Sequence, residues 1–405
     1  MRQSSPRPLP LHLGLSMATS MSGLAALPSA RAGLLPWSAT LAPGAEALTQ
    51  DLKATDDRAL TLAVGAEAMR RVETMLAGIQ AYRDHPWSRP EPSQPIPWRQ
   101  GSARLLDYGG EGPAVLFVPS LVNRYYVLDL LPGRSLLAWL ADAGVHPFVL
   151  DWGAPGDDER AFSIADYVDH RLAPALARVH DLAGGPPILV GYCMGGLLTL
   201  AQAVREPASL RALALLATPW DFHAEAYQGQ ALVLLRQALE TMLRAYGELP
   251  VDLLQMLFAA LDPHLARRKF ARFAAMDPAS EQARQFVALE DWLNDGVALT
   301  APVARTALFD WYGENRTAGG CWQVGDRAID PAGLSMSVFC ALPTQDRIVP
   351  PDSAAALAAA LPQEHLTRIN PGAGHIGMVM GGRGRRQLWQ PLRDWCLAVN
   401  DNVSQ

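Results

Sequence analysis

Lysine is almost absent from this sequence of 405 residues, since only Lys53 and Lys269 supply it among 34 basic residues. The 40 acidic residues give a net charge of -6 and a pI near 5.9. The chain therefore lacks the global basic footprint of a nucleic-acid-binding protein, and we expect no nucleic-acid partner. It has only four cysteines, with no CxxC pair and no histidine–cysteine metal spacing. This excludes a disulfide framework and favours a reducing compartment without a bound metal.

The sequence also lacks an uninterrupted apolar run long enough to span a membrane. The stretch from Leu9 to Leu27 is mildly apolar, but His12, several serines and prolines interrupt it. Arg2 and Arg7 precede this stretch, and residues 30–32 (ARA) resemble a small-residue cleavage site. Residues 1–33 are therefore either a cleaved export signal or an apolar or disordered leader that contacts a partner or an apolar surface.

Residues 34–97 predict a helical extension followed by a linker. Apolar residues recur at helical spacing from about residue 45 to residue 82, and no proline intervenes, which predicts one long helix. Five prolines between residues 86 and 97 indicate the linker. Hydrophobic residues make up 49% of the chain and charged residues 18%, so a sizeable core is expected after the linker.

From residue 98 to residue 400, short apolar strands alternate with helices, which predicts a mostly parallel sheet in an α/β domain. The predicted strands are 102–108, 114–119, 146–151, 187–191, 210–218, 334–342 and 366–370. The predicted helices are 135–142, 164–182 with a kink at Pro174, 195–204 and 351–361. The alternation stops between about residues 220 and 330, and this mostly helical region is expected to form a cap over the sheet.

The sequence Gly191-Tyr192-Cys193-Met194-Gly195 lies between a predicted strand and a predicted helix. This is the context of a nucleophile elbow in an α/β-hydrolase fold, with Cys193 as the nucleophile. The helix N-terminus favours the thiolate, which is the reactive form. The backbone N–H of Met194 is then one oxyanion donor, and the second is expected around Ser120 and Leu121. The alternative is a buried structural cysteine in a glycine-rich turn.

A nucleophile of this kind needs a base and an acid, which in this fold follow it in chain order. His375, in a glycine-rich loop after the last predicted strand, is the candidate base. Asp346, just past the preceding strand, is the candidate acid. Asp221 follows an earlier strand and is the rival acid, unless it only caps a helix. A cysteine nucleophile forms a thioester, which keeps the acyl group activated and favours acyl transfer over hydrolysis.

These residues and several flanking segments resemble the polyhydroxyalkanoate synthases, over about residues 98 to 395. The elbow GYCMGG at 191–196 is similar to the lipase-like box of that family with cysteine in place of serine. Residues 118–144 and the DWG segment at 149–160 are similar to those of the shorter, two-component synthases. Residues 288–296 and the pattern of Trp311, Tyr312 and Asn315 resemble the cap. Asp346 and His375 match the positions of the catalytic acid and histidine of the family, and this resemblance favours Asp346 over Asp221 as the acid.

The resemblance implies an enzyme that polymerises 3-hydroxyacyl-CoA into polyester through a thioester on Cys193. It implies no cofactor, since CoA enters as part of the substrate. The implied partners are the polyester granule surface in the cytoplasm and either a second copy of the chain or a second synthase subunit. In the family, Asp346 orients His375 or activates the 3-hydroxyl of the incoming unit. The residue after the nucleophile, Met194, departs from the glutamine typical of two-component synthases.

Two other functions fit the same residues. A thioesterase or polyester depolymerase of the same fold would release free 3-hydroxy acid, although a cysteine nucleophile disfavours an ordinary esterase. A non-catalytic granule-associated protein would have no need for intact Cys193, Asp346 and His375.

Overall fold

The computed structural model describes residues 5–224, 228–380 and 382–401. Its internal contacts divide the chain into two compact units, each built from two separate stretches of sequence. The helical unit contains the described residues up to Ser88 together with Gln255–Asn294. The sheet unit contains Arg89–Leu254 and the described residues from Asp295 onward. Arg2 of the expected leader lies outside the described residues.

The sheet unit is built on an eight-stranded sheet, which confirms the predicted fold class. Strands β4, β3, β5, β6, β11 and β12 are parallel neighbours in that order, and β2 and β1 extend the β4 edge in antiparallel pairing. In sheet order, the strands are β1 Trp98–Gln100, β2 Ala103–Asp107, β4 His146–Asp151, β3 Ala114–Val118, β5 Ile188–Tyr192, β6 Ala212–Leu216, β11 Val338–Ala341 and β12 Leu366–Ile369. All seven predicted strands are present, and β1 is the one that the sequence did not predict.

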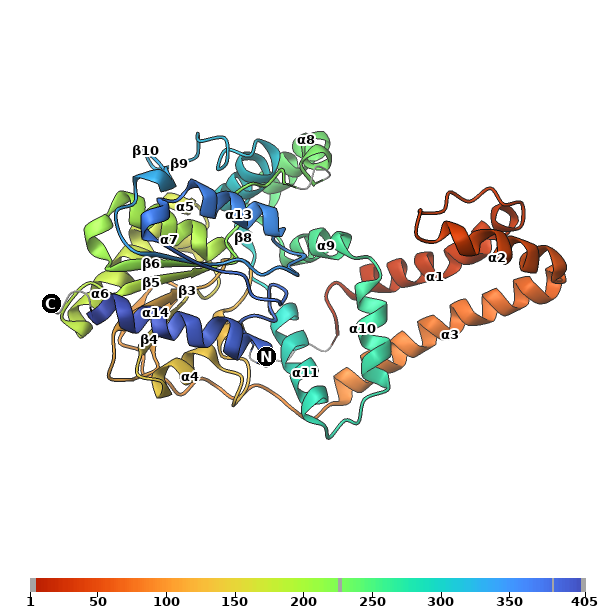
Figure 1. The fold of residues 1–405 in the computed structure, drawn as a ribbon, viewed down its shortest axis with the longest axis horizontal. Coiled ribbons are helices and arrows are strands. Elements are labelled where there is room, and N and C mark those ends of the chain that lie inside the picture. The colour runs from red at the N-terminus through yellow and green to blue at the C-terminus, as the bar shows by residue number, and fades with distance from the viewer. Residues whose placement is uncertain (1–4, 225–227, 381, 402–405) are drawn as a thin grey trace. The chain divides into compact units, whose positions relative to one another are not determined.

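Helices cover both faces of this sheet (Figure 1), with α4 and α14 on one face and α5, α7 and α13 on the other. The flanking helices are α4 Leu136–Asp142, α5 Ile164–Tyr167, α6 Ala173–Ala183, α7 Met194–Arg205, α13 Pro351–Ala360 and α14 Gln390–Asp401. Because successive side chains of a strand point to opposite faces, Leu116 and Val118 of β3 join the core that contains α7 and α13, whereas Phe117 does not. Burial of one such leucine stabilises the fold by roughly 1.5–3 kcal/mol.

The predicted helix 164–182 is interrupted in a way that differs from a simple proline kink. A π-helical segment, Val168–Leu172, separates α5 from α6. Pro174 is the second residue of α6, directly after this π-helical segment. The extra residue in the helical turn therefore comes before the proline.

The insertion between β6 and β11 is shared between the two units. Its elements in the sheet unit are α8 Gln228–Tyr246, β7 Glu248–Leu249, β8 Leu299–Thr300, α12 Ala301–Arg305, a π-helix Thr306–Gly313, β9 Gln323–Val324 and β10 Arg327–Ala328. Helix α9, Val251–Leu261, crosses the boundary, and α10 Leu265–Ala274 and α11 Glu281–Asn294 belong to the helical unit. The region expected as a cap, about residues 220–330, thus contributes to both.

The helical unit combines α10 and α11 with α1 Leu9–Arg31, α2 Ala42–Ala54 and α3 Asp57–Asp84. The prediction of one helix over 45–82 is wrong, because the Asp56 carboxylate accepts the Ala59 N–H at 2.8 Å and starts α3 as a new helix. Helices α3 and α10 pack closely (Figure 1), and a Cβ on Gly78 would lie 1.9 Å from the Phe270 carbonyl oxygen. Only glycine permits this approach.

Residues 9–31 of the expected leader form α1. Its N-terminal leucines, Leu9 and Leu13, pack against the core that Met75, Ile79 and Phe270 share in the helical unit. Among the helices in the described part of the chain, none combines the length and the apolar character that a membrane crossing requires.

Candidate active site

Cys193 occupies a strained turn between β5 and α7. Its φ of 56° and ψ of -128° lie in a backbone region that residues other than glycine rarely adopt. The turn joins the strand directly to the helix. The Cys193 N–H donates to the Leu216 carbonyl of β6 at 2.9 Å, which ties the turn to the sheet. The geometry is that of the nucleophile elbow predicted from residues 191–195.

The glycines on either side of Cys193 allow three backbone segments to meet. A Cβ on Gly191 would lie 2.4 Å from the Gly196 Cα, so the strand and helix could not approach each other with a side chain there. A Cβ on Gly195 would lie 2.1 Å from the Val118 carbonyl and 2.6 Å from that of Pro119. The close approach of Gly195 to Pro119 shows that the loop after β3 packs against the elbow.

His375 and Asp346 form a buried pair in the loops after β12 and β11. The His375 Nδ1 and the Asp346 Oδ2 are 2.6 Å apart, and each residue is only 6% exposed. The other carboxylate oxygen of Asp346 accepts the N–H groups of Ile348 at 2.8 Å and Val349 at 2.9 Å. These bonds fix the carboxylate so that it faces the imidazole.

The second partner of the His375 side chain is Cys193, so the structure brings together the three residues predicted as nucleophile, acid and base. Burial on its own would lower the pKa of His375. The charge of a Cys193 thiolate and the hydrogen bonds to Asp346 and Cys193 oppose burial and raise this pKa to about 10. A negative charge on the Cys193 sulfur is therefore balanced by the protonated form of His375.

Asp221, the rival acid, has other partners. Its Oδ1 accepts hydrogen bonds from the Asn315 side chain at 2.8 Å and from the His223 N–H at 2.9 Å. Asn315, which has a positive φ of 51°, also accepts the Phe222 N–H. Asp221 thus closes a turn and positions the cap loop, while Asp346 is the carboxylate that meets His375.

The other cysteines differ from Cys193 in their surroundings. Cys340 and Cys396 are fully buried, and burial raises the pKa of the Cys340 thiol to about 12 and that of Cys396 further still. Both thiols therefore stay protonated and unreactive at neutral pH. Cys321 is exposed, and no described histidine or carboxylate is hydrogen-bonded to it.

The three predicted oxyanion residues lie at the two segments that meet at Gly195. Met194 is the first residue of α7, where the backbone N–H has no intrahelical partner. Ser120 is 7% exposed, and its hydroxyl accepts the Val122 N–H at 3.3 Å. Leu121 follows it and is also buried. The serine hydroxyl therefore shapes the loop, which leaves backbone N–H groups as the candidate donors.

Sequence reasoning did not identify the residue that holds this loop. The Trp152 indole N–H donates to the Pro119 carbonyl at 3.0 Å, in a buried contact that joins the end of β4 to the loop after β3. The Ser102 hydroxyl in turn donates to the Trp152 carbonyl at 2.7 Å. From the sequence, Trp152 was noted only as part of the DWG segment. Its position directly after a predicted strand is the feature that could have identified it as a residue that holds this loop.

An aromatic cluster lies on the cap side of the site. The π-helix Thr306–Gly313 carries Trp311 and Tyr312, and both rings contact Phe222. Trp322 stacks edge-to-face on Trp311 with ring centroids 5.7 Å apart. Burial and the charge of Cys193 raise the pKa of Tyr312 to about 12, which indicates that Tyr312 lies near the elbow. The cluster provides an apolar environment for the reaction.

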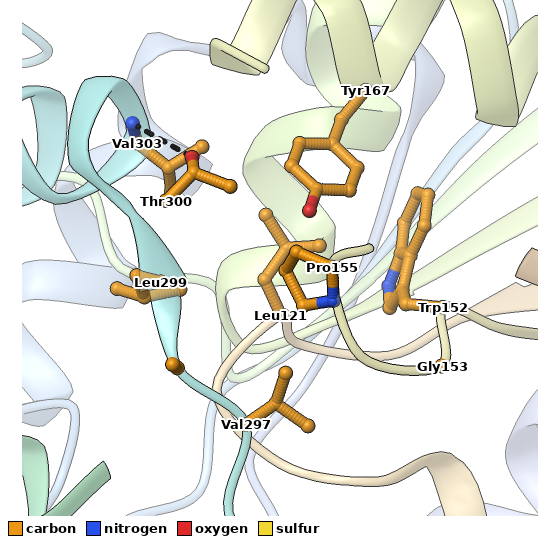
Figure 2. Close-up of a pocket in the computed structure, with 10 residues that line it drawn as sticks. Leu121, Trp152, Gly153, Pro155, Tyr167, Val297, Leu299, Thr300 and Val303 are labelled. Atoms are coloured by element: carbon orange, nitrogen blue, oxygen red, sulfur yellow. Dashed lines mark hydrogen bonds between the residues drawn. The ribbon is translucent and has the colours of Figure 1, made fainter. Parts of the chain in front are cut away.

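A narrow pocket borders the loop after β3 (Figure 2). Leu121, Trp152 and Tyr167 form part of its lining, together with Val297 and Leu299 from the insertion. Most of the residues that line it are apolar, and Tyr167 and Thr300 supply its polar side chains. No cluster of histidine, cysteine, aspartate or glutamate that could hold a metal occurs in residues 5–224, 228–380 and 382–401.

Comparisons with known proteins identify the family. A family model described as the alpha/beta hydrolase fold matches residues 113–381. The chain is 30% identical over 290 residues to the poly(3-hydroxyalkanoate) polymerase subunit PhaC of Synechocystis, covering 69% of this chain and 76% of that protein. It is 28% identical over 313 residues to the subunit of the same name from Haloferax mediterranei. That match covers 74% of this chain but 63% of the relative.

A solved structure with a similar fold is the monoacylglycerol lipase of Paleococcus ferrophilus, which is 15% identical and has a TM-score of 0.47. The match covers 73% of this chain and 99% of the lipase. The family model spans more than half of the chain, and most of the Synechocystis subunit aligns with it. The chain therefore belongs to the alpha/beta hydrolase fold family and, within it, to the family of poly(3-hydroxyalkanoate) polymerase PhaC subunits.

Proposed function

We propose that this protein is a poly(3-hydroxyalkanoate) polymerase that joins 3-hydroxyacyl units and releases CoA. Membership of the PhaC family supports this function, since its named relatives are polymerase subunits. The observation that carries the proposal is the side chain of His375, which joins the elbow cysteine Cys193 to the buried carboxylate of Asp346. A nucleophile, a base and an orienting acid are thus present in one site.

In the first step, His375 accepts the Sγ proton of Cys193, and the thiolate attacks the thioester carbonyl of the acyl-CoA. The Met194 N–H and a backbone N–H at Ser120 or Leu121 would stabilise the oxyanion that forms. The carbon–sulfur bond to CoA then breaks, and the imidazolium returns its proton to the leaving thiolate. The products are free CoA and an acyl group bound to Cys193 as a thioester.

In the second step, the 3-hydroxyl of another unit attacks this thioester. His375 accepts the hydroxyl proton, an ester bond forms, and the Cys193 sulfur leaves as the thiolate that the imidazolium stabilises. Asp346 orients the imidazole throughout and offsets its positive charge. Because a thioester is a better acyl donor than an oxyester, cysteine suits repeated transfer to hydroxyl groups.

The expected partners follow from this chemistry. The substrate is a 3-hydroxyacyl-CoA, and the product is an insoluble polyester, so the protein would act at the surface of a cytoplasmic granule. The relatives are named as subunits, which favours assembly with a second synthase subunit or a second copy of the chain.

The test is an assay of the purified chain with 3-hydroxybutyryl-CoA, with and without a candidate partner subunit. Chromatography measures CoA release, and methanolysis of the insoluble fraction measures polyester. We expect both products, and we expect Cys193→Ala to abolish both while Cys321→Ala, at an exposed cysteine, leaves them unchanged. Polymer made by Cys193→Ala would refute the proposal, and free 3-hydroxy acid without polymer would identify a hydrolase instead.

A further inference from the structure

Three arginines follow the His375 loop in the sheet unit. Arg383, Arg385 and Arg386 lie within residues 371–392, a segment that contains no aspartate and no glutamate. The chain as a whole carries a net charge of -6, so this segment is a local excess of positive charge in an acidic protein. Such an excess attracts anionic ligands.

The fold uses only one of these arginines. The Arg385 guanidinium lies over the ring of Trp139, 5.5 Å from its centroid. Arg383 and Arg386 are exposed, and within the described part of the chain neither forms a hydrogen bond, an ion pair or a ring contact. Both lie at the N-terminal end of the helix that continues into α14, where the helix dipole disfavours positive charge. Their charge therefore adds nothing to the stability of this helix.

An open recess of about 410 Å³ lies beside the two unused arginines and is lined by Arg383, Arg386 and Gln387. This volume is in the range of small-molecule sites, which is about 300–1,000 Å³. The Gln387 Oε1 is buried and accepts no hydrogen bond from any described residue. The recess thus offers two guanidinium groups to an anion and one acceptor to a hydroxyl or amine group.

The recess lies next to the loop that carries the proposed base, His375. A Cβ on Gly384 would lie 2.3 Å from the Met378 carbonyl oxygen, so the arginine segment packs directly on the residues that follow His375. At the other end of that loop, a Cβ on Gly372 would lie 3.5 Å from the Gln387 Nε2. The arginine segment and the His375 loop therefore form one packed structure.

The strand order places this structure at the same edge of the sheet as the nucleophile. Cys193 follows β5 and His375 follows β12, and the loops after parallel strands meet at one edge. Arg134, in the loop after β3, also reaches the arginine segment, because its Nη1 would be 3.7 Å from a Cβ on Gly382. Helices α4 and α14, which these two loops precede, cover the same face of the sheet (Figure 1). Positive charge from two loops is thus gathered at the edge where the reaction is proposed to occur.

We propose that Arg383 and Arg386 bind the phosphate groups of the acyl-CoA whose thioester reacts with Cys193. The proposal rests on the proposed polymerase function and adds the residues that bind the nucleotide end of the substrate. The pantetheine arm separates the sulfur of CoA from its diphosphate and 3′-phosphate. A thioester at Cys193 therefore places these phosphates away from the nucleophile, toward the surface of the same edge. Guanidinium groups bind phosphate oxygens through paired hydrogen bonds, which an exposed arginine without a partner can form.

Two substrates that differ only in the nucleotide test this role. They are 3-hydroxybutyryl-CoA and 3-hydroxybutyryl-pantetheine, and chromatography measures the release of CoA or pantetheine. Arg383→Gln and Arg386→Gln should each raise KM for the CoA thioester about 5-fold, the effect of one exposed ion pair. The kcat should stay unchanged, because the phosphates are bound equally in the ground state and the transition state. KM for the pantetheine thioester should also stay unchanged.

The matched control is Arg99→Gln. Arg99 is an exposed arginine of β1, the strand at the opposite edge of the sheet from β12. Its replacement removes the same charge from the molecule but not from the recess, so it should change neither KM.

A binding measurement tests the recess without a reaction. Isothermal titration calorimetry with adenosine 3′,5′-bisphosphate, a fragment of CoA, should show binding to the wild-type protein that both arginine variants weaken about 5-fold. Added salt should weaken the wild-type binding, because exposed charges are screened. Inorganic phosphate should bind more weakly than the bisphosphate, since it lacks the nucleoside and the second phosphate group.

The outcomes separate this proposal from the proposed function. If the wild-type protein reacts with neither thioester, the polymerase function is refuted, and the calorimetry decides whether the recess binds nucleotide phosphates. If it reacts but the arginine variants keep the wild-type KM for the CoA thioester, or raise both KM values equally, the function stands and the recess is not the phosphate site. Inorganic phosphate that bound as tightly as the bisphosphate, or an equal rise of KM in Arg99→Gln, would also overturn the proposal.

Discussion

The two units of the molecule place their buried polar groups differently. In the helical unit, the Tyr82 hydroxyl donates to Asp291, and the Lys269 ammonium lies 2.7 Å from Glu290. These groups are paired within the unit and add stability to it. The sheet unit also contains a buried ion pair, Arg171 with Glu159. In addition, it holds His375 between Cys193, in its strained turn, and the carboxylate of Asp346. The comparison predicts that the helical unit serves the fold and that the proposed chemistry belongs to the sheet unit.

Replacement of Asp346 by asparagine is expected to have the largest effect, because it acts on the charge balance of the site. The carboxylate helps to raise the pKa of His375 to about 10, against the lowering effect of burial. Without it, this pKa falls, so His375 holds a proton less firmly and balances less of the negative charge that develops on the Cys193 sulfur. We expect CoA release at pH 7 to fall by about 10²- to 10⁴-fold.

The rate at which iodoacetamide alkylates Cys193, measured as a function of pH, tests the same Asp346→Asn substitution. At neutral pH, Cys193 of the wild-type protein should be alkylated faster than that of Asp346→Asn, because a protonated His375 beside the sulfur favours reaction through the thiolate. Asp221→Asn is the matched control, since Asp221 bonds to Asn315 and not to His375. If Asp221→Asn lost activity and Asp346→Asn did not, the assignment of the acid would be reversed.

Trp152→Phe should have a smaller and more selective effect. The change removes the indole N–H that donates to the Pro119 carbonyl, so the loop after β3, which is proposed to bind the oxyanion, loses one hydrogen bond. Loss of a whole oxyanion donor costs about 10²- to 10³-fold in kcat, so a residue that only positions the loop should cost less, on the order of 10-fold. KM should change little, because the transition state is affected more than the bound substrate.

The alkylation rate separates this role from general destabilisation. Reaction with iodoacetamide forms no oxyanion, so Trp152→Phe should keep the wild-type alkylation rate while acylation by 3-hydroxybutyryl-CoA falls. Trp139→Phe, at a partly exposed ring that contacts Trp389 on the other face of the sheet, should change neither rate. Equal losses in both reactions would show that Trp152 acts on the elbow as a whole.

The sequence predicted the sheet unit better than the helical unit, for physical reasons. Buried parallel strands are continuous apolar runs, and the elbow needs glycines at fixed positions, so both leave a local signal. The break between α2 and α3 depends on one capping side chain, Asp56, inside an otherwise helical pattern. The packing of α3 against α10 joins residues almost 200 positions apart, and the role of Trp152 is a contact across 33 positions. Local patterns carry no information on such contacts.

The last prediction concerns the helical unit, where we expect an effect on stability but not on chemistry. Gly78→Ala would place a Cβ 1.9 Å from the Phe270 carbonyl oxygen, so α3 and α10 would have to move apart. We expect a loss of about 1–3 kcal/mol in the free energy of unfolding, measured by urea denaturation. Gly65→Ala, in the same helix, is the matched control, because its Cβ would have no neighbour closer than 3.9 Å.

Gly65→Ala should gain roughly 0.5–1 kcal/mol from the better helix propensity of alanine. In both variants, the rate at which iodoacetamide alkylates Cys193 should equal that of the wild-type protein, because none of the residues that set this rate belongs to the helical unit. If Gly78→Ala slowed alkylation while Gly65→Ala did not, the packing of α3 on α10 would be coupled to the elbow, and the division of roles between the two units would fail.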